Sequence, residues 1–191
     1  MRTIFVLMAF IFSTPCLFAQ PTERDLEFVA GLNQKRIAAG RSPVKLDLTL
    51  FEGCRKHSIK MSRGYLDHAS RSERLGASEN IAKGNSDAGA TFIQWKNAKD
   101  GRGRPTGHYA NLMNPQWRYI GIACVDGANG QSYWTFRGKA DPLGESIEVP
   151  PKEFVVRERV RATQNKTVYK QTQRHVSNQR PLLNAVRHFF R

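Results

Sequence analysis

Apolar residues recur along residues 23–63 at the spacing of two amphipathic helices, each packed through one face. In residues 23–39 this face would consist of Leu26, Ala30, Asn33 and Ile37. In residues 48–63 it would consist of Leu50, Cys54, His57 and Met61. Asp47 precedes the second helix as an N-cap, and Gly40 and Gly64 follow the two helices as stop signals. The folded part of the chain is therefore predicted to begin with two helices.

The pattern becomes irregular after the second helix and then changes its period. Residues 65–76 are polar and typical of a loop, and Asp87 can cap a third helix that runs through Ala90, Ile93 and Trp95. A Gly- and Arg-rich loop over 99–108 and a short helix over 109–113 follow. Residues 119–125 and 132–136 are rich in β-branched and aromatic residues, and the turn-forming residues between them predict a β-hairpin. Helices followed by a hairpin predict an α+β domain whose helices cover an antiparallel sheet.

The N-terminal residues have the pattern of a secretion signal. Arg2 is followed by an apolar run over 3–12, and small residues lead to Ala19, after which we expect cleavage. The run is shorter than the roughly 20 residues of a transmembrane helix. A buried N-terminal helix is the alternative, but the run has no polar face. Residues 1–19 are therefore predicted to be a signal peptide, and the protein to be secreted or periplasmic.

Removal of the signal peptide would leave two cysteines, Cys54 and Cys124. In an oxidising compartment such a pair predicts a disulfide. Closing the loop of about 70 residues between the two cysteines would stabilise the fold by about 4 kcal/mol. Two separate buried thiols are the alternative. The choice depends on geometry, which the sequence does not supply.

The net charge of +14 is concentrated toward the C-terminus, where residues 150–191 contain ten Lys or Arg and two acids. We expect residues 140–191 to form a basic, largely disordered tail with a short terminal helix from residue 181. The apolar face of that helix would carry Leu182, Leu183, Val186, Phe189 and Phe190. Contact with an anionic membrane or polymer is one interpretation of this helix, and docking onto the domain is the other.

Short motifs follow one another between residues 33 and 134. They are Asn33-x-x-Arg36-x-x-x-Gly40-x-x-Pro43, a loop histidine at 68, Glu79-Asn80-Ile81-Ala82, Phe92-x-x-Trp95, Gly107-His108-x-x-Asn111, Ile120-Gly121-Ile122 and Tyr133-Trp134. Their order and spacing over residues 25–138 resemble the CAP superfamily of cysteine-rich secretory, antigen 5 and pathogenesis-related proteins, in its bacterial form. The resemblance implies export and, over residues 20–139, a three-layer α-β-α sandwich with a central antiparallel sheet. It also implies a cleft lined by two histidines and two glutamates.

Three of the four cleft positions are matched in this chain, by His68, Glu79 and His108. The second glutamate position is Ala98, with Asp100 as a speculative substitute. The resemblance implies that the histidines can bind a metal such as zinc, with Glu79 as a third ligand. A second interpretation is that Glu79 only orients His108, in a cleft that holds a polar ligand without metal. The remaining interpretation is that Glu79 ties down loops and both histidines are ordinary surface groups.

Three functions follow from these features. The leading hypothesis is a secreted binding protein for a lipid, envelope or protein ligand. The second is a metal-dependent hydrolase, which Ala98 disfavours because hydrolysis needs a positioned general base. The third is an adhesion protein that contacts a membrane or envelope through its cationic tail.

Several other residues have simpler interpretations. His57 and the three tryptophans at 95, 117 and 134 are expected to serve packing, and Asn33 to hydrogen-bond neighbouring backbone. Arg102-Gly103-Arg104-Pro105 matches the core of an AT-hook. The signal peptide and the place of this motif inside the domain argue against nucleic acid as a partner.

Overall fold

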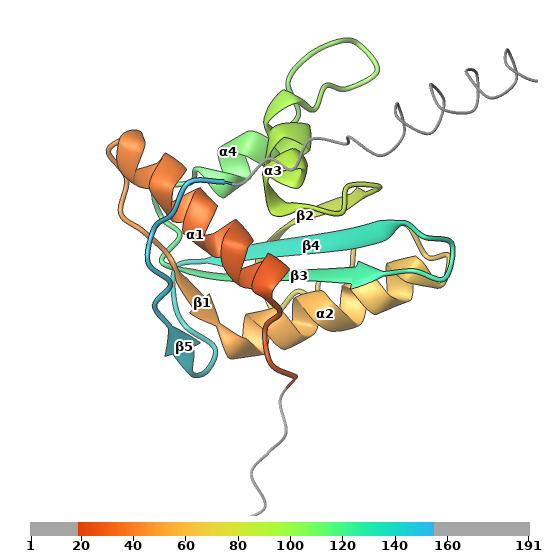
Figure 1. The fold of residues 1–191 in the computed structure, drawn as a ribbon, viewed down its shortest axis with the longest axis horizontal. Helices are drawn as coiled ribbons and strands as arrows, with labels where there is room; N and C mark the ends of the chain where they lie inside the picture. Colours follow the sequence, from red (N-terminus) through yellow and green to blue (C-terminus); the bar gives the residue numbers. More distant parts are fainter. Residues whose placement is uncertain (1–18, 155–191) are drawn as a thin grey trace, which may run out of the picture. The chain divides into compact units, whose positions relative to one another are not determined.

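The computed structural model describes residues 19–154, which form one layered domain (Figure 1). The predicted signal peptide, apart from Ala19, and the predicted terminal helix lie outside the described residues. Among residues 19–154, no helix is both long and apolar enough to span a bilayer.

Within residues 19–154, four helices form where the periodicity predicts them, and each of the three longer ones begins at a side-chain cap. They are α1 (Glu23–Ala38), α2 (Leu48–Ser62), α3 (Ala88–Asn97) and the short α4 (His108–Leu112). Thr22 and Asp25 form a capping box at α1, while Asp47 and Asp87 accept backbone bonds at α2 and α3. On α1 the predicted apolar face is wrong at Ile37, which is 45% exposed, and Arg36 is buried instead.

In the described part of the chain, five strands form a single sheet in the order β2-β4-β3-β1-β5. They are β1 (Lys45–Asp47), β2 (Ser78–Lys83), β3 (Tyr119–Asp126), β4 (Ser132–Lys139) and β5 (Ser146–Ile147). The predicted hairpin is β3-β4, and β2 pairs with β4 so that it occupies one edge. The sheet is antiparallel except where the short β1 runs parallel to β3.

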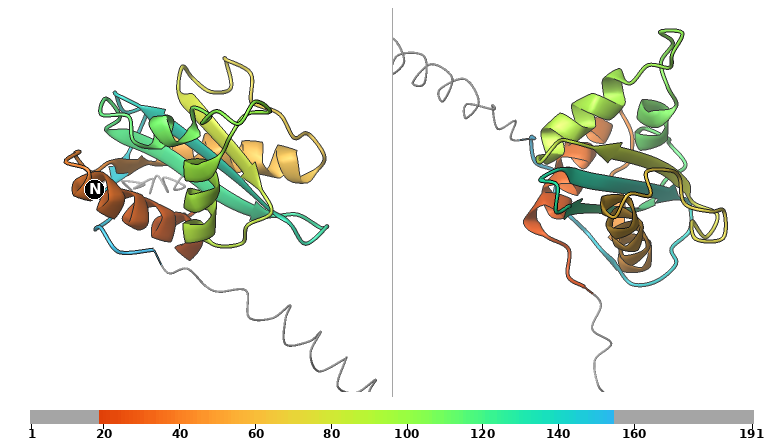
Figure 2. Two further views of the ribbon diagram at one scale, coloured as in Figure 1. Left: turned by 90° about the horizontal axis from the view of Figure 1, so that it is seen from above. Right: turned by 90° about the vertical axis from the view of Figure 1, so that its right-hand side faces the viewer.

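Helices cover both faces of the sheet, as the end-on view in Figure 2 shows, with α2 on one side and α1, α3 and α4 on the other. On the α2 face, a Cβ at Gly121 would lie 2.4 Å from the backbone of Leu50, so glycine permits this close helix-to-strand approach. On the opposite face Phe28, Trp95 and Trp134 pack edge-on or tilted, at centroid distances of 5.5 and 5.9 Å. The arrangement is the predicted three-layer α-β-α sandwich.

The predicted disulfide between Cys54 and Cys124 is absent, and both thiols are free and buried. Cys54 lies on α2, which packs on the face of the sheet where a Cβ at Gly121 would lie. Cys124 is three residues farther along β3, and alternation turns its side chain to the opposite face. The sheet therefore separates the two sulfurs, and burial raises the pKa of both thiols, that of Cys124 to about 12.

The domain also extends beyond residue 139, where the basic tail was predicted to begin. β5 pairs with β1, and the segment after it runs along α1. Asn33 donates to the carbonyls of Val44 and Val149 at 3.0 and 3.1 Å, so it bonds backbone as predicted. The Phe154 ring lies against Gly31, where a Cβ would meet it. The predicted boundary is wrong because residues 140–154 contribute a strand and an aromatic contact that their Pro- and Gly-rich composition hides.

Reducing agent is therefore expected to leave the thermal unfolding midpoint unchanged. The physical reason is that no loop is closed by a bond between Cys54 and Cys124, so reduction cannot enlarge the unfolded ensemble. Calorimetry with and without dithiothreitol measures the midpoint, and alkylation of the denatured, unreduced protein should modify both cysteines. A drop of several degrees on reduction would contradict the separation of the thiols.

Candidate functional site

A buried ion pair between neighbouring strands lies at the centre of the site. Glu79 on β2 is directly opposite Arg137 on β4. Nε and Nη2 of Arg137 both lie 2.9 Å from Oε2 of Glu79, and the two side chains are 2% and 0% exposed. Burying two such charges is unfavourable unless the remaining hydrogen-bonding capacity is also used. The surroundings of Glu79 meet that requirement.

The other carboxylate oxygen of Glu79 holds the loop that precedes β2. Oε1 accepts a bond of 2.9 Å from the backbone N–H of Ala69 and another of 2.9 Å from Nδ1 of His68. Burial acts to raise the pKa of Glu79, but the bonds from His68, Ala69 and Arg137 outweigh it and hold that pKa below its usual value. Glu79 is therefore an ionised acceptor that organises its neighbours.

His68 presents its other nitrogen to the surface. A carboxylate can only accept hydrogen bonds, so Nδ1 of His68 carries the proton toward Glu79. The side chain is 48% exposed, and Nε2 has no hydrogen-bond partner among residues 19–154. In the neutral imidazole this outer nitrogen holds a free lone pair.

His108 approaches from the other side of the edge strand, at the first residue of α4. Its Nδ1 lies 2.8 Å from the Thr106 hydroxyl, and its carbonyl accepts a bond of 2.9 Å from Asn80. Burial and the nearby His68 imidazole both lower the pKa of His108, which favours its neutral form. Within the described part of the chain, Nε2 of His108 also lacks a partner.

An amide network explains why Asn80 and Asn111 accompany these residues. Asn111 donates to Asn80 at 2.8 Å and accepts from Ser78 and Trp117 at 2.7 and 2.9 Å. Because Asn80 in turn donates to the carbonyl of His108, the network joins β2 to the start of α4. Both asparagines therefore position His108.

Sequence reasoning missed two features of this site. The first is Arg137, and the second is the contact that His57 makes with the neighbouring loop. His57 is buried as expected, at 3% exposure, but its Nε2 donates to the Asp67 carbonyl at 2.9 Å and lies 4.0 Å from Glu79. Burial lowers the pKa of His57. Its place on the inward stripe of α2 indicated burial, but only the register between β2 and β4 brings Arg137 beside Glu79.

The carboxylates near the site are already occupied. Four N–H groups point at Glu79, and Asp100 accepts from the backbone N–H groups of Arg102 and Arg104 and from the Arg104 guanidinium. Asp100 thus shapes its own loop and does not replace the glutamate missing at Ala98. Among residues 19–154, no three His, Cys, Asp or Glu side chains are arranged to hold a metal ion. Glu79 does not fit a third metal ligand, because its carboxylate already accepts bonds from His68, Ala69 and Arg137.

Comparison with known proteins gives consistent matches. A model of the cysteine-rich secretory protein family, CAP, matches residues 29–137, which is more than half of the chain. YkwD of Bacillus subtilis (strain 168) is 31% identical over 123 residues, covering 56% of this chain and 44% of that protein. The chain thus spans less than half the length of this relative.

Solved structures share the fold. An outer surface protein of Borrelia burgdorferi matches with a TM-score of 0.51 and 16% identity, over 63% of this chain and 96% of that one. NaASP2, crystallised with Zn²⁺, matches with a TM-score of 0.51 and 13% identity, over 73% of this chain and 91% of that one. At these identities the likeness concerns architecture.

Replacement of Glu79 by Gln is expected to destabilise the fold by about 3–5 kcal/mol, because Arg137 would remain buried without a counter-charge. The folded-state pKa of Glu79 lies below its usual value of 4.5, so its contribution is present above pH 4.5 and is lost as pH falls through the folded value. Urea unfolding across the acid range should show a steeper loss in the wild type than in Glu79→Gln. Parallel curves would contradict this linkage, and Glu145→Gln, at an exposed acid before β5, is the matched control.

Gly53→Ala is expected to lower the free energy of unfolding, whereas the same substitution inside a helix usually raises it. Inside a helix this change normally stabilises by about 1 kcal/mol. At Gly53 of α2, however, the new Cβ would lie 2.7 Å from Nη1 of Arg137 and push the guanidinium away from Glu79. We expect a loss of about 1–3 kcal/mol in the free energy of unfolding, measured by urea titration. A gain in stability would show that Arg137 is free to move.

Proposed function

The chain belongs to the cysteine-rich secretory protein (CAP) family, and on this premise we propose that it is an extracytoplasmic binding protein that acts through His68 and His108. One observation carries the proposal: each imidazole is held at Nδ1, by Glu79 or by Thr106, and leaves Nε2 free. Two imidazoles fixed in this way are prepared to engage a common ligand at the edge of β2.

Zinc is the metal that this donor set suits best. Metal-binding histidines usually donate their second nitrogen to a carboxylate or another oxygen, which fixes the ring and its tautomer. Glu79 supplies such an oxygen to His68, and the Thr106 hydroxyl supplies one to His108. The Zn²⁺ in the structure of NaASP2 supports the idea from a protein of the same fold. A bound zinc ion would accept an oxygen or nitrogen ligand at its open positions.

Binding is a better interpretation of the site than hydrolysis. A metal-dependent hydrolase in which both imidazoles hold the metal would need a further group, such as a free carboxylate, to take a proton from water. Glu79 accepts four bonds, Asp100 is bonded within its loop, and Ala98 occupies the position of the family's second glutamate. The described residues therefore favour recognition of a ligand over its cleavage.

The family and the sequence support a proposed location and a class of partners. Family members include secretory proteins, and the structural neighbour from Borrelia burgdorferi is an outer surface protein. Together with the apolar segment at 3–12, this supports a place outside the cytoplasm, where a lipid, an envelope polymer or another protein would be the ligand. Adhesion through the basic tail involves residues beyond 154, outside the described residues.

Zinc binding tests the proposal directly. Titration of the metal-free protein with zinc in a calorimeter is expected to show a site that weakens at least tenfold in His68→Ala and again in His108→Ala. The reason is that each variant removes one of the two nitrogen ligands. His175 and His188 remain unchanged in these variants and serve as an internal control. Unchanged affinity in both variants would refute the site.

Thr106 offers a second, more specific test. Thr106→Val removes the hydroxyl that meets Nδ1 of His108 while keeping the shape of the side chain, and we expect zinc affinity to fall about tenfold. Thr106→Ser keeps the hydroxyl and should restore binding. If valine and serine at this position bind zinc equally, the hydroxyl does not orient His108.

A further inference from the structure

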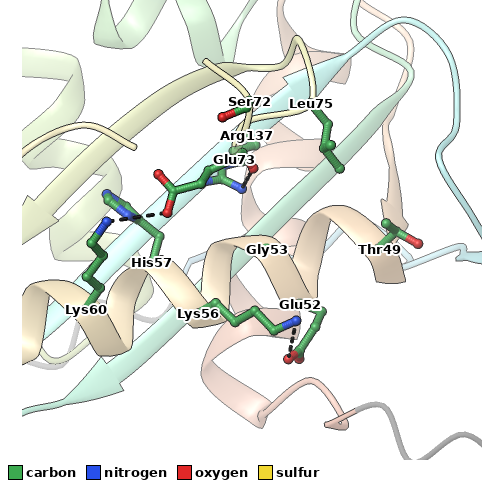
Figure 3. A pocket seen from close by; sticks show the side chains of 10 residues that line it. All are labelled: Thr49, Glu52, Gly53, Lys56, His57, Lys60, Ser72, Glu73, Leu75 and Arg137. Carbon is green, nitrogen blue, oxygen red and sulfur yellow. Dashed lines mark hydrogen bonds and ion pairs between the residues drawn. The ribbon is translucent and has the colours of Figure 1, made fainter. Parts of the chain in front are cut away.

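A second cavity, distinct from the surface site at His68 and His108, lies between α2 and the turn at residues 72–75. Its volume is about 520 Å³, within the range of small-molecule sites. Figure 3 shows Lys56 and Lys60 of α2 on one side, Leu75 of the turn on the other, and Arg137 behind Glu73. The cavity shares His57 and Arg137 with the inner surroundings of Glu79, whereas neither His68 nor His108 lines it.

Arg137 gives this cavity hydrogen-bonding capacity that the fold does not use. Its guanidinium has five N–H groups. Two bond Glu79 and one bonds the Glu73 carbonyl at 2.9 Å, which leaves two without a partner among residues 19–154. The side chain is only 2% exposed, but Arg137 lines the cavity, so a ligand seated in the cavity could accept from these donors.

The helix adds positive charge beside these donors. Lys56 and Lys60 of α2 line the cavity with Arg137, together with two acids, Glu52 and Glu73. Lys56 is 74% exposed, and its Nζ lies 3.8 Å from Glu52, beyond hydrogen-bonding distance. This long, exposed ion pair can be exchanged for a contact with a ligand, while Lys60 bonds Glu73 at 3.4 Å.

Leu75 forms the apolar wall of the cavity, and its backbone adopts an unfavourable conformation. Leu75 has a φ of 52°, the only positive φ at a residue other than glycine between residues 19 and 154. A branched side chain is unfavourable in this left-handed region, and such strain is concentrated at functional sites. The cost leaves the Leu75 side chain 51% exposed at the cavity, where it gains little from core packing.

We propose that this cavity binds a small amphipathic anion, with a carboxylate or phosphate at Arg137 and Lys56 and an apolar chain against Leu75. The unused donors of Arg137 and the exchangeable ammonium group of Lys56 select the charge, and the leucine with the lysine stems selects the chain. This site is independent of the proposed metal site.

Calorimetry of the full chain at 0.15 M salt tests the chemistry with octanoate, octyl phosphate and octanol. We expect one of the two anions to bind at least tenfold more tightly than octanol, and the stronger one identifies the headgroup. Lys56→Gln should weaken that anion about tenfold. Arg55→Gln removes the same charge from the same helix outside the cavity and should leave affinity unchanged.

Leu75→Gly separates ligand binding from simple damage to the fold. Glycine relieves the left-handed strain, so the thermal midpoint should rise, while affinity for the anion falls about tenfold because the apolar wall is lost. Leu66→Gly, at a similarly exposed leucine of the same loop, should leave affinity unchanged.

The proposal is overturned if octanol binds as well as both anions, or if Lys56→Gln and Leu75→Gly bind the preferred anion like the wild type. A loss of anion binding in the double variant His68→Ala and His108→Ala would also overturn it, because the anion would then occupy the surface site. Retained binding in that variant supports a separate cavity, whatever the outcome for zinc.

Discussion

The buried pair of Glu79 and Arg137 constrains most of this structure. Neither charge is exposed to water, so the folded state requires a donor or acceptor for the polar atoms of the pair. Glu79 bonds Ala69 and His68, and Arg137 bonds the carbonyl of Glu73. The long loop before β2 is therefore attached to the sheet by charge-assisted hydrogen bonds more than by apolar packing. The place of His68 at the surface is a consequence of this attachment.

The two faces of the sheet differ in chemistry. The face under α1 and α3 holds the aromatic core around Phe28, Trp95 and Trp134. The face under α2 holds the ion pair and a hydroxyl contact of 2.9 Å between Ser58 and Thr135. The cavity and the Glu79 carboxylate that holds His68 lie on this polar face, whereas His108 approaches the edge strand from the other side.

Many of the motif residues serve the fold. Arg36, fully buried, donates to the carbonyl of Ser42 after α1 and to the carbonyls of Leu112, Asn114 and Trp117 where α4 ends. Burial lowers the pKa of this arginine, but its guanidinium remains charged in proteins. Asn80 and Asn111 act in the same way at the beginning of α4. In the motifs that resemble the CAP family, the two histidines stand out because each leaves a nitrogen free.

Local physics made the helices and the β-hairpin predictable. Caps such as Asp47 and Asp87, the apolar stripe of α2 and the turn at 126–130 act within a few residues, so they can be recognised before folding is considered. The order of the motifs similarly indicated His68, Glu79 and His108. The location outside the cytoplasm and the metal remain predictions.

The remaining features depend on contacts between distant parts of the chain. The register of β2 against β4 decides that Arg137 faces Glu79, and the alternation along β3 decides that Cys124 turns away from Cys54. The pairing of β5 with β1 extends the domain past residue 139. A strand of two to six residues carries too little periodicity to reveal its partner or its inward face. Tertiary packing alone assigns each side chain to a face of the sheet, and thereby creates both the ion pair and the cavity beside α2.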